Sequence, residues 1–320
     1  MGDRRTMIFL MDPIRSIDIR VDTTFALMLE AQERGHRVLY AAPEGLSVRD
    51  GCPVARIREA TLRSELGNHV DLGPEHRLVL DEESDVVFQR VDPPVDAAYA
   101  VVTQILTLCQ RTRVLNRPES ILFANEKLYA LHFRELMPET LVTRRVDELL
   151  EFLAKLGGEM IVKPLDGKGG EGIFHVRSDD RNLSSILEQS TQFGARVTMA
   201  QRYLAAVRNG DKRILLVDGA PIGAVLRVPS EGETRANLHV GGRAERAALD
   251  ENDRRIIERI EPSLRRDGLF FVGIDVIGGY LTEINVTSPT GIQEANALGA
   301  VRLEARVLDG VEALLDGGDA

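Results

Sequence analysis

Short apolar runs alternate with helix signals along the first part of this 320-residue chain, and this alternation constrains the fold more than any other feature. Residues 7–11 form an apolar run suited to a buried strand. A helix capped by Asp22 follows, Gly35 can end it, and residues 37–41 form the next strand. A further strand is expected at 85–89. Because strands connected through helices pair in parallel, the pattern predicts a parallel sheet with helices on its faces.

The same alternation continues to about residue 116. Residues 96–110 are expected to form a helix after the loop at 90–94, and residues 114–116 a strand. Residues 49–77 are charged and only weakly periodic, so we expect an irregular excursion there.

The pattern changes after residue 146. We expect a compact α+β unit whose first helix is capped by Asp147 and ended by Gly157-Gly158. Its expected elements are helices at 147–156 and 183–189 and strands at 160–163, 173–177 and 197–201. From residue 211 onward hairpin signals dominate, with Asp218-Gly219 as a type I′ turn. Helices at 250–267 and after residue 297 complete the expected elements.

The charge balance excludes several classes of partner. The chain has 40 basic and 50 acidic residues, a net charge of −10, whereas nucleic-acid backbones and anionic membranes select for clustered Lys and Arg. Trp is absent and aromatic residues are only 5%, which disfavours a stacking platform for single-stranded nucleic acid. A small anionic ligand remains compatible, since it needs only a local cluster of positive charge.

Cysteine usage and the N-terminus indicate the compartment. Cys52 and Cys109 are the only cysteines and lie far apart, which disfavours a structural zinc site and suits a reducing compartment. The apolar run at 7–11 is too short for a signal peptide or a membrane span. We therefore expect a soluble cytoplasmic protein.

A glycine-rich loop interrupts the middle unit. Gly167, Gly169 and Gly172 spell G-x-G-x-x-G, but a dinucleotide site needs a helix directly after the loop, and residues 173–176 favour a strand. No Ser or Thr follows the loop lysine, so it is no Walker A loop either. What remains is a hairpin whose tip can place backbone N–H groups on an anion, with Lys163 in the preceding strand. A plain glycine turn gives the same pattern.

Three polar residues interrupt the most apolar strand pair of the chain. Glu283 and Asn285 are two positions apart and share one strand face. A two-residue turn at Gly278-Gly279 puts Asp275 on the opposite face, whereas a loop of three or five residues sets it across from Glu283. In the second register, two carboxylates and an amide oxygen form a set of hard ligands for Mg²⁺. Solvent-facing polar residues on an ordinary strand are the alternative.

With these elements in order, the chain resembles the prokaryotic glutathione synthetases, which are ATP-grasp ligases. The resemblance runs nearly from end to end and rests on many motifs in one order. They are Met11-Asp-Pro-Ile14, Asp92-Pro-Pro94, Asn125-Glu-Lys127, Lys163-Pro-Leu-Asp-Gly167 with Gly169-Gly170, Asp211-Lys-Arg213, Gly232-Glu-Thr-Arg235 with Asn237 and Gly241-Gly242, and Thr282-Glu-Ile-Asn-Val-Thr-Ser-Pro-Thr290.

The resemblance implies an α/β fold and an activity. An N-terminal parallel-sheet (Rossmann-like) domain at 1–123 precedes an ATP-grasp fold of two α+β subdomains, the central lid at 124–204 and the catalytic part at 205–320. The implied reaction joins γ-glutamylcysteine to glycine through an acyl phosphate, giving glutathione, ADP and phosphate. The protein then positions groups and neutralises charge, without a covalent nucleophile. The family is typically tetrameric, which implies a homo-oligomer.

The resemblance also implies roles for individual residues. The nucleotide positions are Lys127, Lys163, Gly169, Gly170, Gln201, Tyr203, Leu204 and Asp211. The positions for Mg²⁺, or for Mn²⁺ in its place, are Asp275, Glu283 and Asn285. Arg213 and Arg227 are the catalytic positions, where guanidinium groups stabilise the transferring phosphoryl group. The substrate positions are Arg227, Glu233, Arg235, Asn237 and Gly241, in a loop at 227–243 that we expect to close over the site.

The chain departs from the family at two positions. Val91 and Gln293 stand where the family usually has a basic residue, which leaves the dipeptide and the acceptor amine open: a related dipeptide or a different amine is the alternative. Two other functions compete with the ligase. A nicotinamide dehydrogenase requires a helix after Gly172, where the sequence favours a strand. A non-catalytic nucleotide-binding module would not require both lysines and all three metal positions, and all five are present.

Overall fold

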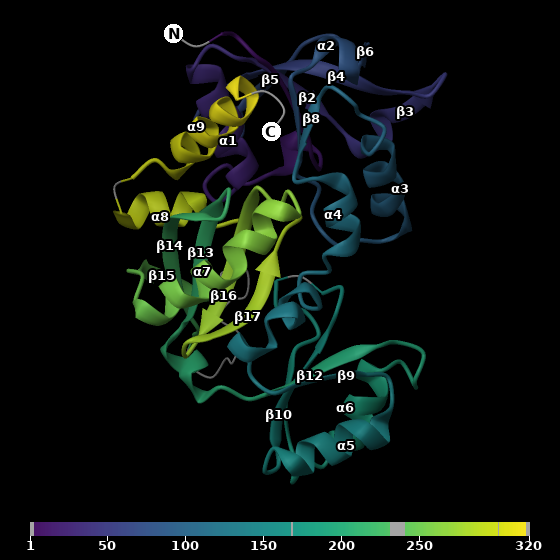
Figure 1. The fold of residues 1–320 in the computed structure, drawn as a ribbon, viewed down its shortest axis with the longest axis vertical. Coiled ribbons are helices and arrows are strands. Elements are labelled where there is room, and N and C mark those ends of the chain that lie inside the picture. Colours follow the sequence, from purple (N-terminus) through teal and green to yellow (C-terminus); the bar gives the residue numbers. More distant parts are fainter. Residues whose placement is uncertain (1–2, 168, 231–240, 300, 318–320) are drawn as a thin grey trace.

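The computed structural model describes residues 3–167, 169–230, 241–299 and 301–317. These residues form three sheets, stacked from top to bottom in Figure 1 as an N-terminal sheet, a C-terminal sheet and a central one. The fold is the mixed α/β architecture that the sequence predicts. The boundaries after residues 123 and 204 stay predictions.

The N-terminal sheet has a parallel centre in the order β2-β1-β7-β8, as the strand–helix alternation predicts. These strands are β1 (Thr6–Leu10), β2 (Arg37–Ala41), β7 (Val86–Gln89) and β8 (Arg113–Leu115). The helices of this region are α1 (Thr23–Glu33), α2 (Leu80–Glu83), α3 (Ala97–Leu106) and α4 (Pro118–Phe123). Asp22 and Asp96 cap α1 and α3 by accepting hydrogen bonds from backbone N–H groups of the first turn.

The expectation of an irregular excursion at 49–77 is wrong. The segment carries most of an antiparallel extension of the sheet, built from β3 (Leu46–Arg49), β4 (Cys52–Leu62), β5 (Val70–Leu72) and β6 (His76–Val79). Ala55 and Ile57 of β4 enter one core, whereas Ala60 and Leu62 enter the core on the other face of the sheet. The apolar alternation therefore changes phase near Glu59, which hides the strand from a period-two pattern.

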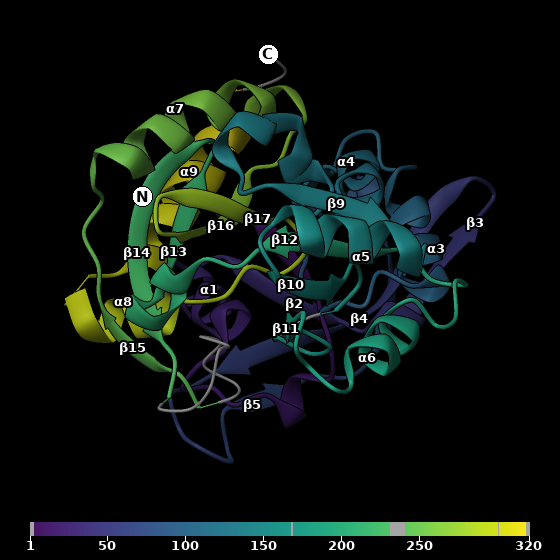
Figure 2. The same cartoon turned by 90° about the horizontal axis from the view of Figure 1, so that it is seen from below.

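The central sheet is antiparallel, in the order β11-β10-β12-β9, and two helices cover one face (Figure 2). Its elements are β9 (Thr140–Thr143), α5 (Val146–Lys155), β10 (Glu159–Pro164), β11 (Phe174–Arg177), α6 (Leu183–Ser190) and β12 (Thr198–Arg202). Asp147 does not cap α5, because the N-cap is Arg145 and Asp147 lies in the first turn, where it pairs with the Arg145 side chain. The glycine-rich loop joins two strands, as predicted.

The C-terminal sheet has the order β15-β14-β13-β16-β17. Its elements are β13 (Asp211–Val217), β14 (Ala220–Val228), β15 (Arg243–Arg246), α7 (Glu251–Arg266), β16 (Phe271–Ile277) and β17 (Tyr280–Asn285). The predicted turn between β13 and β14 is confirmed, since Asp218 and Gly219 both have a positive φ, at 47° and 74°.

The hairpin of β16 and β17 combines two features that the sequence offered as alternatives. The turn has two residues, with Ile277 opposite Tyr280, yet Asp275 lies opposite Glu283. A β-bulge reconciles the two, because the register shifts between Asp275 and Val276 and leaves Thr282 as the extra residue. The Thr282 hydroxyl donates to the Asp275 carbonyl oxygen at 3.1 Å, within the bulge.

Two C-terminal helices, α8 (Ile292–Gly299) and α9 (Leu303–Asp316), return to the N-terminal part, and α9 packs along α1 (Figure 1). One hydrophobic core contains Met7 and Phe9 of β1 together with Val307 and Val311 of α9. A buried side chain fixes the same junction: the Asn116 amide nitrogen donates to the carbonyl oxygens of Phe271 and Val286, and its oxygen accepts from the Phe271 N–H. The C-terminal sheet is thus held firmly to the N-terminal sheet.

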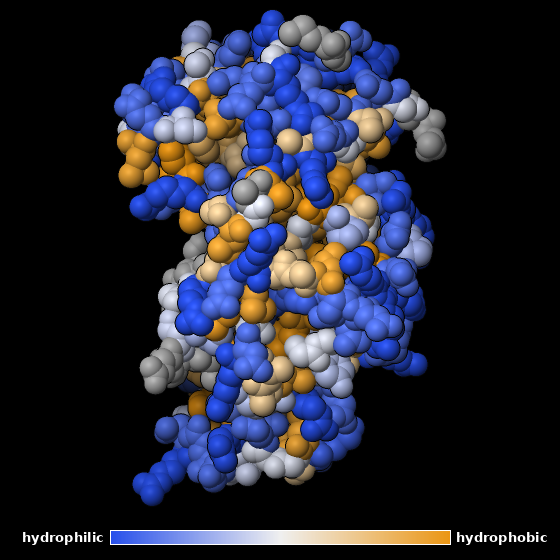
Figure 3. All heavy atoms as spheres, turned by 90° about the vertical axis from the view of Figure 1, so that its left-hand side faces the viewer, coloured by the Kyte–Doolittle hydropathy of each residue, from blue (hydrophilic) through white to orange (hydrophobic). Residues whose placement is uncertain are grey.

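Polar and apolar residues are unevenly distributed on the surface. Hydrophilic residues cover much of the face drawn in Figure 3, and apolar residues gather mainly near its middle. Among the residues that the structure describes, no helix is long and apolar enough to cross a membrane.

Candidate active site

A cleft of about 850 Å³ lies where the three sheets meet. The central sheet contributes Lys163 and Gln201 to its walls, and the C-terminal sheet contributes Arg213 and Asp275. Asp92 lines it from the N-terminal sheet's side. Apolar and charged groups share the lining, as is usual for a pocket that holds an organic ligand with an anionic part.

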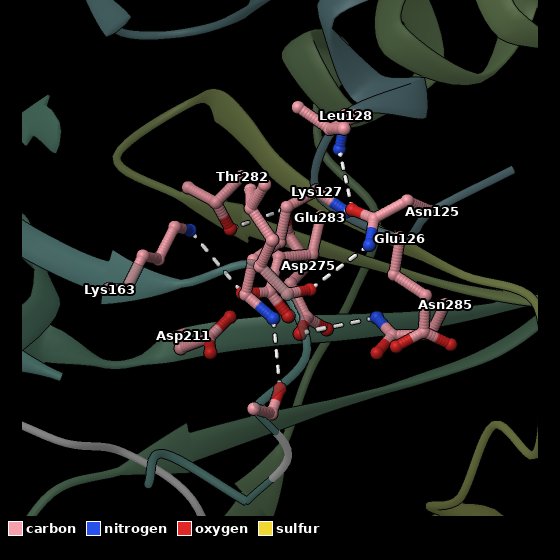
Figure 4. Close-up of polar contacts among 12 residues, drawn as sticks. Asn125, Glu126, Lys127, Leu128, Lys163, Asp211, Asp275, Thr282, Glu283 and Asn285 are labelled. Carbon is pink, nitrogen blue, oxygen red and sulfur yellow. Dashed lines mark hydrogen bonds and ion pairs between the residues drawn. The ribbon is translucent and has the colours of Figure 1, made fainter. Parts of the chain in front are cut away.

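Glu283 lies between two lysines from different parts of the chain (Figure 4). Its Oε1 is 3.3 Å from the Lys163 Nζ and 3.7 Å from the Lys127 Nζ, and both lysines are buried. Burial alone would raise the pKa of Glu283, but the two ammonium groups outweigh it and hold this pKa below its usual value. Burial lowers the pKa of Lys163. Two positive charges are therefore concentrated at the wall of the cleft.

Asp275 is paired with two arginines. The Arg213 Nε and Nη2 donate to its two carboxylate oxygens, the second at 2.9 Å, and the Arg227 Nη2 lies 3.0 Å from its Oδ2. Burial would raise the pKa of Asp275, but both guanidinium groups outweigh it and lower this pKa. Gly273 makes the arrangement possible, because a Cβ there would lie 3.0 Å from the Arg213 Cδ.

Asp211 completes this charged cluster. Its Oδ2 accepts a hydrogen bond from the Arg227 Nη2, and burial raises its pKa to about 6. Burial would lower the pKa of Arg227, but Asp211 and Asp275 outweigh it and raise this pKa. Four buried charged groups (Asp211, Arg213, Arg227, Asp275) and the half-buried Glu283 thus come from one sheet.

The three predicted metal positions lie together on one face of the hairpin. Asp275 is opposite Glu283, and the Asn285 amide nitrogen donates to the Gly273 carbonyl oxygen at 3.1 Å and lies 3.4 Å from Asp275 Oδ2. No group of three or more His, Cys, Asp or Glu side chains among the described residues is arranged to hold a metal. The set present, two carboxylates and one amide oxygen, fits Mg²⁺, which prefers oxygen ligands and completes its shell with water and phosphate.

The glycine-rich loop contacts the charged cluster. The Lys127 Nζ donates to the Gly167 carbonyl oxygen at 2.9 Å. Gly169 and Gly170 have φ of 61° and 86°, a backbone region that favours glycine, and both line the cleft. A side chain at Gly167 would approach the Pro164 Cγ to 2.8 Å. The glycines are therefore needed for the shape of the loop.

The predicted nucleotide segment forms the adjacent wall. Gln201, Tyr203 and Leu204 all line the cleft. The Gln201 amide donates to the Thr140 hydroxyl at 2.9 Å, and the Tyr203 ring stacks on His175 with 4.0 Å between centroids.

The sequence-based assignment missed one half-buried carboxylate in the cleft, Glu126. Glu126 Oε1 accepts from the backbone N–H groups of Val286 and Thr287 and from the Thr287 hydroxyl, at 2.8–3.2 Å. Burial raises the pKa of Glu126. Its hydrogen bonds hold the segment carrying Lys127 against the end of β17. The sequence does carry one signal for Glu126: it lies between Asn125 and Lys127, within one of the motifs on which the family resemblance rests.

The substrate positions are only partly described. Glu233, Arg235 and Asn237 lie outside the described residues. Gly241 is exposed and is not a lining residue of the cleft, and its carbonyl oxygen accepts from the Ser230 hydroxyl. Arg227, which is also a catalytic position, lines the cleft.

The two departures from the family have local structural roles. The Gln293 amide donates to the Ile19 carbonyl oxygen at 3.0 Å, which ties α8 to the loop before α1. Val91 packs against the core on one face of the N-terminal sheet. The neighbouring Arg90 is buried and donates to the Thr24 hydroxyl and the Pro289 carbonyl oxygen, and burial lowers its pKa to about 10.

Solved structures show the fold. It is that of the ATP-grasp ligases. It matches D-cycloserine synthetase DcsG with a TM-score of 0.67 at 15% identity, over 97% of this chain and 99% of that one. It matches macrocyclase MdnC, solved with its precursor peptide MdnA from Microcystis aeruginosa, with a TM-score of 0.64 at 12% identity, over 98% and 99%.

Sequence comparison gives the family. The N-terminal domain model of prokaryotic glutathione synthetase matches residues 6–121, and the ATP-grasp domain model matches residues 126–300. A glutathione synthetase of Mesorhizobium japonicum is 48% identical over 94% of this chain and 96% of its own. Those of Brucella melitensis (47%, over 95% and 97%) and Agrobacterium fabrum (44%, over the full length of both) are similarly close. The chain belongs to the prokaryotic glutathione synthetase family and is an ATP-dependent ligase.

Proposed function

We propose that this protein joins the cysteinyl carboxylate of γ-glutamylcysteine to the amine of glycine with ATP, giving glutathione, ADP and phosphate. Relatives named glutathione synthetase, alike over nearly the whole chain, support the substrates. The observation that carries the proposal is the buried cluster in which Lys127, Lys163, Arg213 and Arg227 surround Asp275 and Glu283. Such a cluster suits a reaction that transfers a phosphoryl group.

The nucleotide occupies the part of the cleft between the central and C-terminal sheets. Gln201, Tyr203 and Leu204 hold its base, and Gly169 and Gly170 cover its phosphates with backbone groups. Lys127 and Lys163 neutralise the phosphate charge, and Asp211 fixes Arg227. Each lysine exchanges part of its attraction to Glu283 for one to a phosphate oxygen.

A divalent cation fits beside these groups. Asp275, Glu283 and Asn285 would hold Mg²⁺, or Mn²⁺, through oxygen atoms. The cation supplies neutralisation of charge on the phosphates. Because Asp275 is already paired with Arg213 and Arg227, both guanidinium groups are positioned within reach of the same phosphates.

The arginines serve the two chemical steps. The substrate carboxylate takes the γ-phosphoryl group, and ADP leaves. The amine then attacks the acyl carbon, and phosphate leaves with one former carboxylate oxygen. Arg213 and Arg227 stay charged throughout and bind the oxygens on which negative charge develops. Exclusion of water protects the acyl phosphate, a role we assign to the loop at 227–243.

The remaining assignments are also proposals. Glu233, Arg235, Asn237 and Gly241 contact the substrate once the loop at 227–243 has closed over the cleft, which Gly241 does not line in the structure described. Val91 and Gln293 leave a related dipeptide or a different acceptor amine as the second candidate. The protein works in the cytoplasm as a homo-oligomer on small molecules, without nucleic acid or membrane. Its domains divide at 1–123, 124–204 and 205–320.

A coupled ADP-release assay across several dipeptides and amines tests the reaction. We expect ADP release to require both γ-glutamylcysteine and glycine, with a clear preference over γ-glutamylalanine and over alanine. A preference for another pair would replace the substrates but keep the ligase. ADP release that does not depend on any amine would contradict ligation itself.

A further inference from the structure

One row of side chains crosses the central sheet on the side that faces the cleft. Val162 and Ala200 point to the opposite side, into the core that this sheet shares with α5 and α6. Their neighbours along the strands face the cleft, because successive side chains of a strand alternate between the two faces. The pairing register aligns one such residue from each strand, in the order His175, Ile161, Gln201 and Thr140. His175 thus stands at the β11 end of the row.

Tyr203 lies two residues after Gln201 and contacts the β11 end of this row. Tyr203 lines the cleft, whereas His175 is not a lining residue. The two rings are stacked, with 4.0 Å between their centroids and 16° between their planes. Strand β10 lies between β11 and β12 (Figure 2), so the Tyr203 ring reaches past β10 to contact β11.

The stack on His175 determines how the Tyr203 ring is oriented. The Tyr203 hydroxyl is buried and has no hydrogen-bond partner among the described residues, so no hydrogen bond of its own holds the ring. The His175 ring, in contrast, is anchored, because its Nε2 donates to the Oε1 of Glu159 on β10 at 2.9 Å. Glu159 therefore fixes His175, and His175 fixes Tyr203.

We propose that His175 is a positioning residue for nucleotide binding, which holds the Tyr203 ring as a preformed wall of the base subsite. This inference rests on the proposed function, in which Gln201, Tyr203 and Leu204 hold the base of ATP. A side chain that is ordered before the ligand arrives loses less conformational freedom on binding, so the affinity is higher. Because His175 does not line the cleft, it acts through Tyr203.

A second role of His175 has to be separated from this one. His175 lies three residues after Gly172, the last glycine of the loop that leads into β11. If His175 acted by holding that loop over the phosphates, its loss would weaken binding of any polyphosphate. If it acts through Tyr203, only ligands that carry a base are affected. Inorganic tripolyphosphate, which has the phosphates without the base, distinguishes the two roles.

Isothermal titration calorimetry on the full chain with Mg²⁺, using ATP and tripolyphosphate in turn, tests the proposal. We expect His175→Ala to raise the dissociation constant of ATP about fivefold, because an aromatic contact that orders the wall is lost. The dissociation constant of tripolyphosphate and kcat at saturating ATP should both stay within about twofold of wild type. His175→Phe keeps a flat ring against Tyr203 and should restore most of the ATP affinity, whereas His175→Leu should not.

Arg177→Ala is the matched control. Arg177 lies two residues after His175 on the same strand, is exposed and pairs with Asp179, so its loss should leave ATP binding unchanged. Thermal unfolding midpoints within a few degrees of wild type confirm that each variant is folded.

The outcomes separate this inference from the proposed function. Unchanged ATP affinity in His175→Ala overturns the inference alone, as does an equal loss for tripolyphosphate or a leucine variant that binds ATP as well as the phenylalanine variant. A wild-type protein that does not bind ATP overturns both the inference and the proposed nucleotide site. The measurement needs no dipeptide or amine, so its result does not depend on which pair the enzyme joins.

Discussion

The two sheets that enclose the cleft are built differently. The central sheet with α5 and α6, here the β9–β12 lobe, has a core of its own whose residues all lie between 141 and 200. The C-terminal sheet shares the core of one face with the N-terminal sheet and α9, and that of the other face with α7 and the segment around Phe133. The lobe is therefore an independently packed unit, whereas the C-terminal sheet is a fixed part of the larger body.

The groups that we assign to the reaction are divided between the same two parts of the molecule. The C-terminal sheet supplies Asp275, Glu283 and the two arginines, whose mutual pairing requires a fixed register. The lobe supplies Lys163, the glycine-rich loop and the apolar wall, which must close over a ligand and release it. We infer that the rigid sheet determines the rate of the chemical steps, and the lobe determines nucleotide affinity.

The sharpest test removes charge from the rigid sheet. We expect Asp275→Asn and Glu283→Gln each to lower kcat about 1,000-fold or more in the ADP-release assay, with ATP affinity changed less than about tenfold. The amide variants are preferable to alanine, because Asp275→Ala leaves Arg213 buried without a carboxylate partner and Arg227 with Asp211 alone.

Asp253→Asn is the control for these variants. Asp253 is buried and paired with Lys212, but outside the cleft. The Asp253→Asn variant should therefore retain its activity. Near-normal turnover in either cleft variant would contradict the metal assignment.

The separate core of the lobe can be tested without ligands. Leu149 is fully buried in that core, so Leu149→Ala should cost about 2–5 kcal/mol of local stability. Hydrogen exchange should rise across residues 140–202 while residues 211–285 keep their protection. Leu264→Ala, in the core that α7 shares with the C-terminal sheet, should give the reverse pattern. Equal loss of protection in both regions would show that the two sheets unfold as one.

The buried lysine of the lobe, Lys163, has the next largest expected effect. Lys163→Met should lower kcat/KM for ATP about 100-fold, because an ammonium group buried beside the phosphates is lost. Lys212→Met, on β13 but paired with Asp250 and Asp253, serves as the control. A loss confined to kcat, with nucleotide affinity intact, would contradict the inference that the lobe determines nucleotide affinity and the C-terminal sheet determines the rate of the chemical steps.

A single methyl group gives the smallest expected effect. In Gly273→Ala the added Cβ would lie 3.0 Å from the Arg213 Cδ and 3.1 Å from the Pro289 Cβ, so Arg213 must shift. We expect kcat to fall about tenfold. Gly73→Ala has its nearest neighbour at 3.6 Å and should behave as wild type. An unchanged kcat in Gly273→Ala would show that Arg213 tolerates displacement.

Much of this organisation could be predicted from the sequence. The parallel centre, the glycine-rich hairpin and the turn at Asp218 all follow from local signals that act within a few residues. The fold and the class of enzyme, an ATP-dependent ligase, could be predicted because many motifs of the family occur in this chain in the same order. The individual site roles stay predictions, although the structure brings the described ones to a single cleft apart from Gly241.

The features that the sequence did not predict depend on contacts between residues that are far apart in the chain. The strand β4 was missed because its apolar residues change faces near Glu59, where it leaves one core for another. The register of Asp275 was left open because the bulge at Thr282 depends on how two strands meet, which turn chemistry alone does not determine. Glu126 was missed because its partners, Val286 and Thr287, lie 160 and 161 residues away in the sequence.

The position of α9 has a consequence for how the chain matures. Val307 and Val311 complete the core that Met7 and Phe9 begin, so strand β1 cannot be fully packed before helix α9 has been made. The β9–β12 lobe, in contrast, has all its core residues once residue 200 has emerged from the ribosome. The lobe can therefore become stable before the N-terminal sheet.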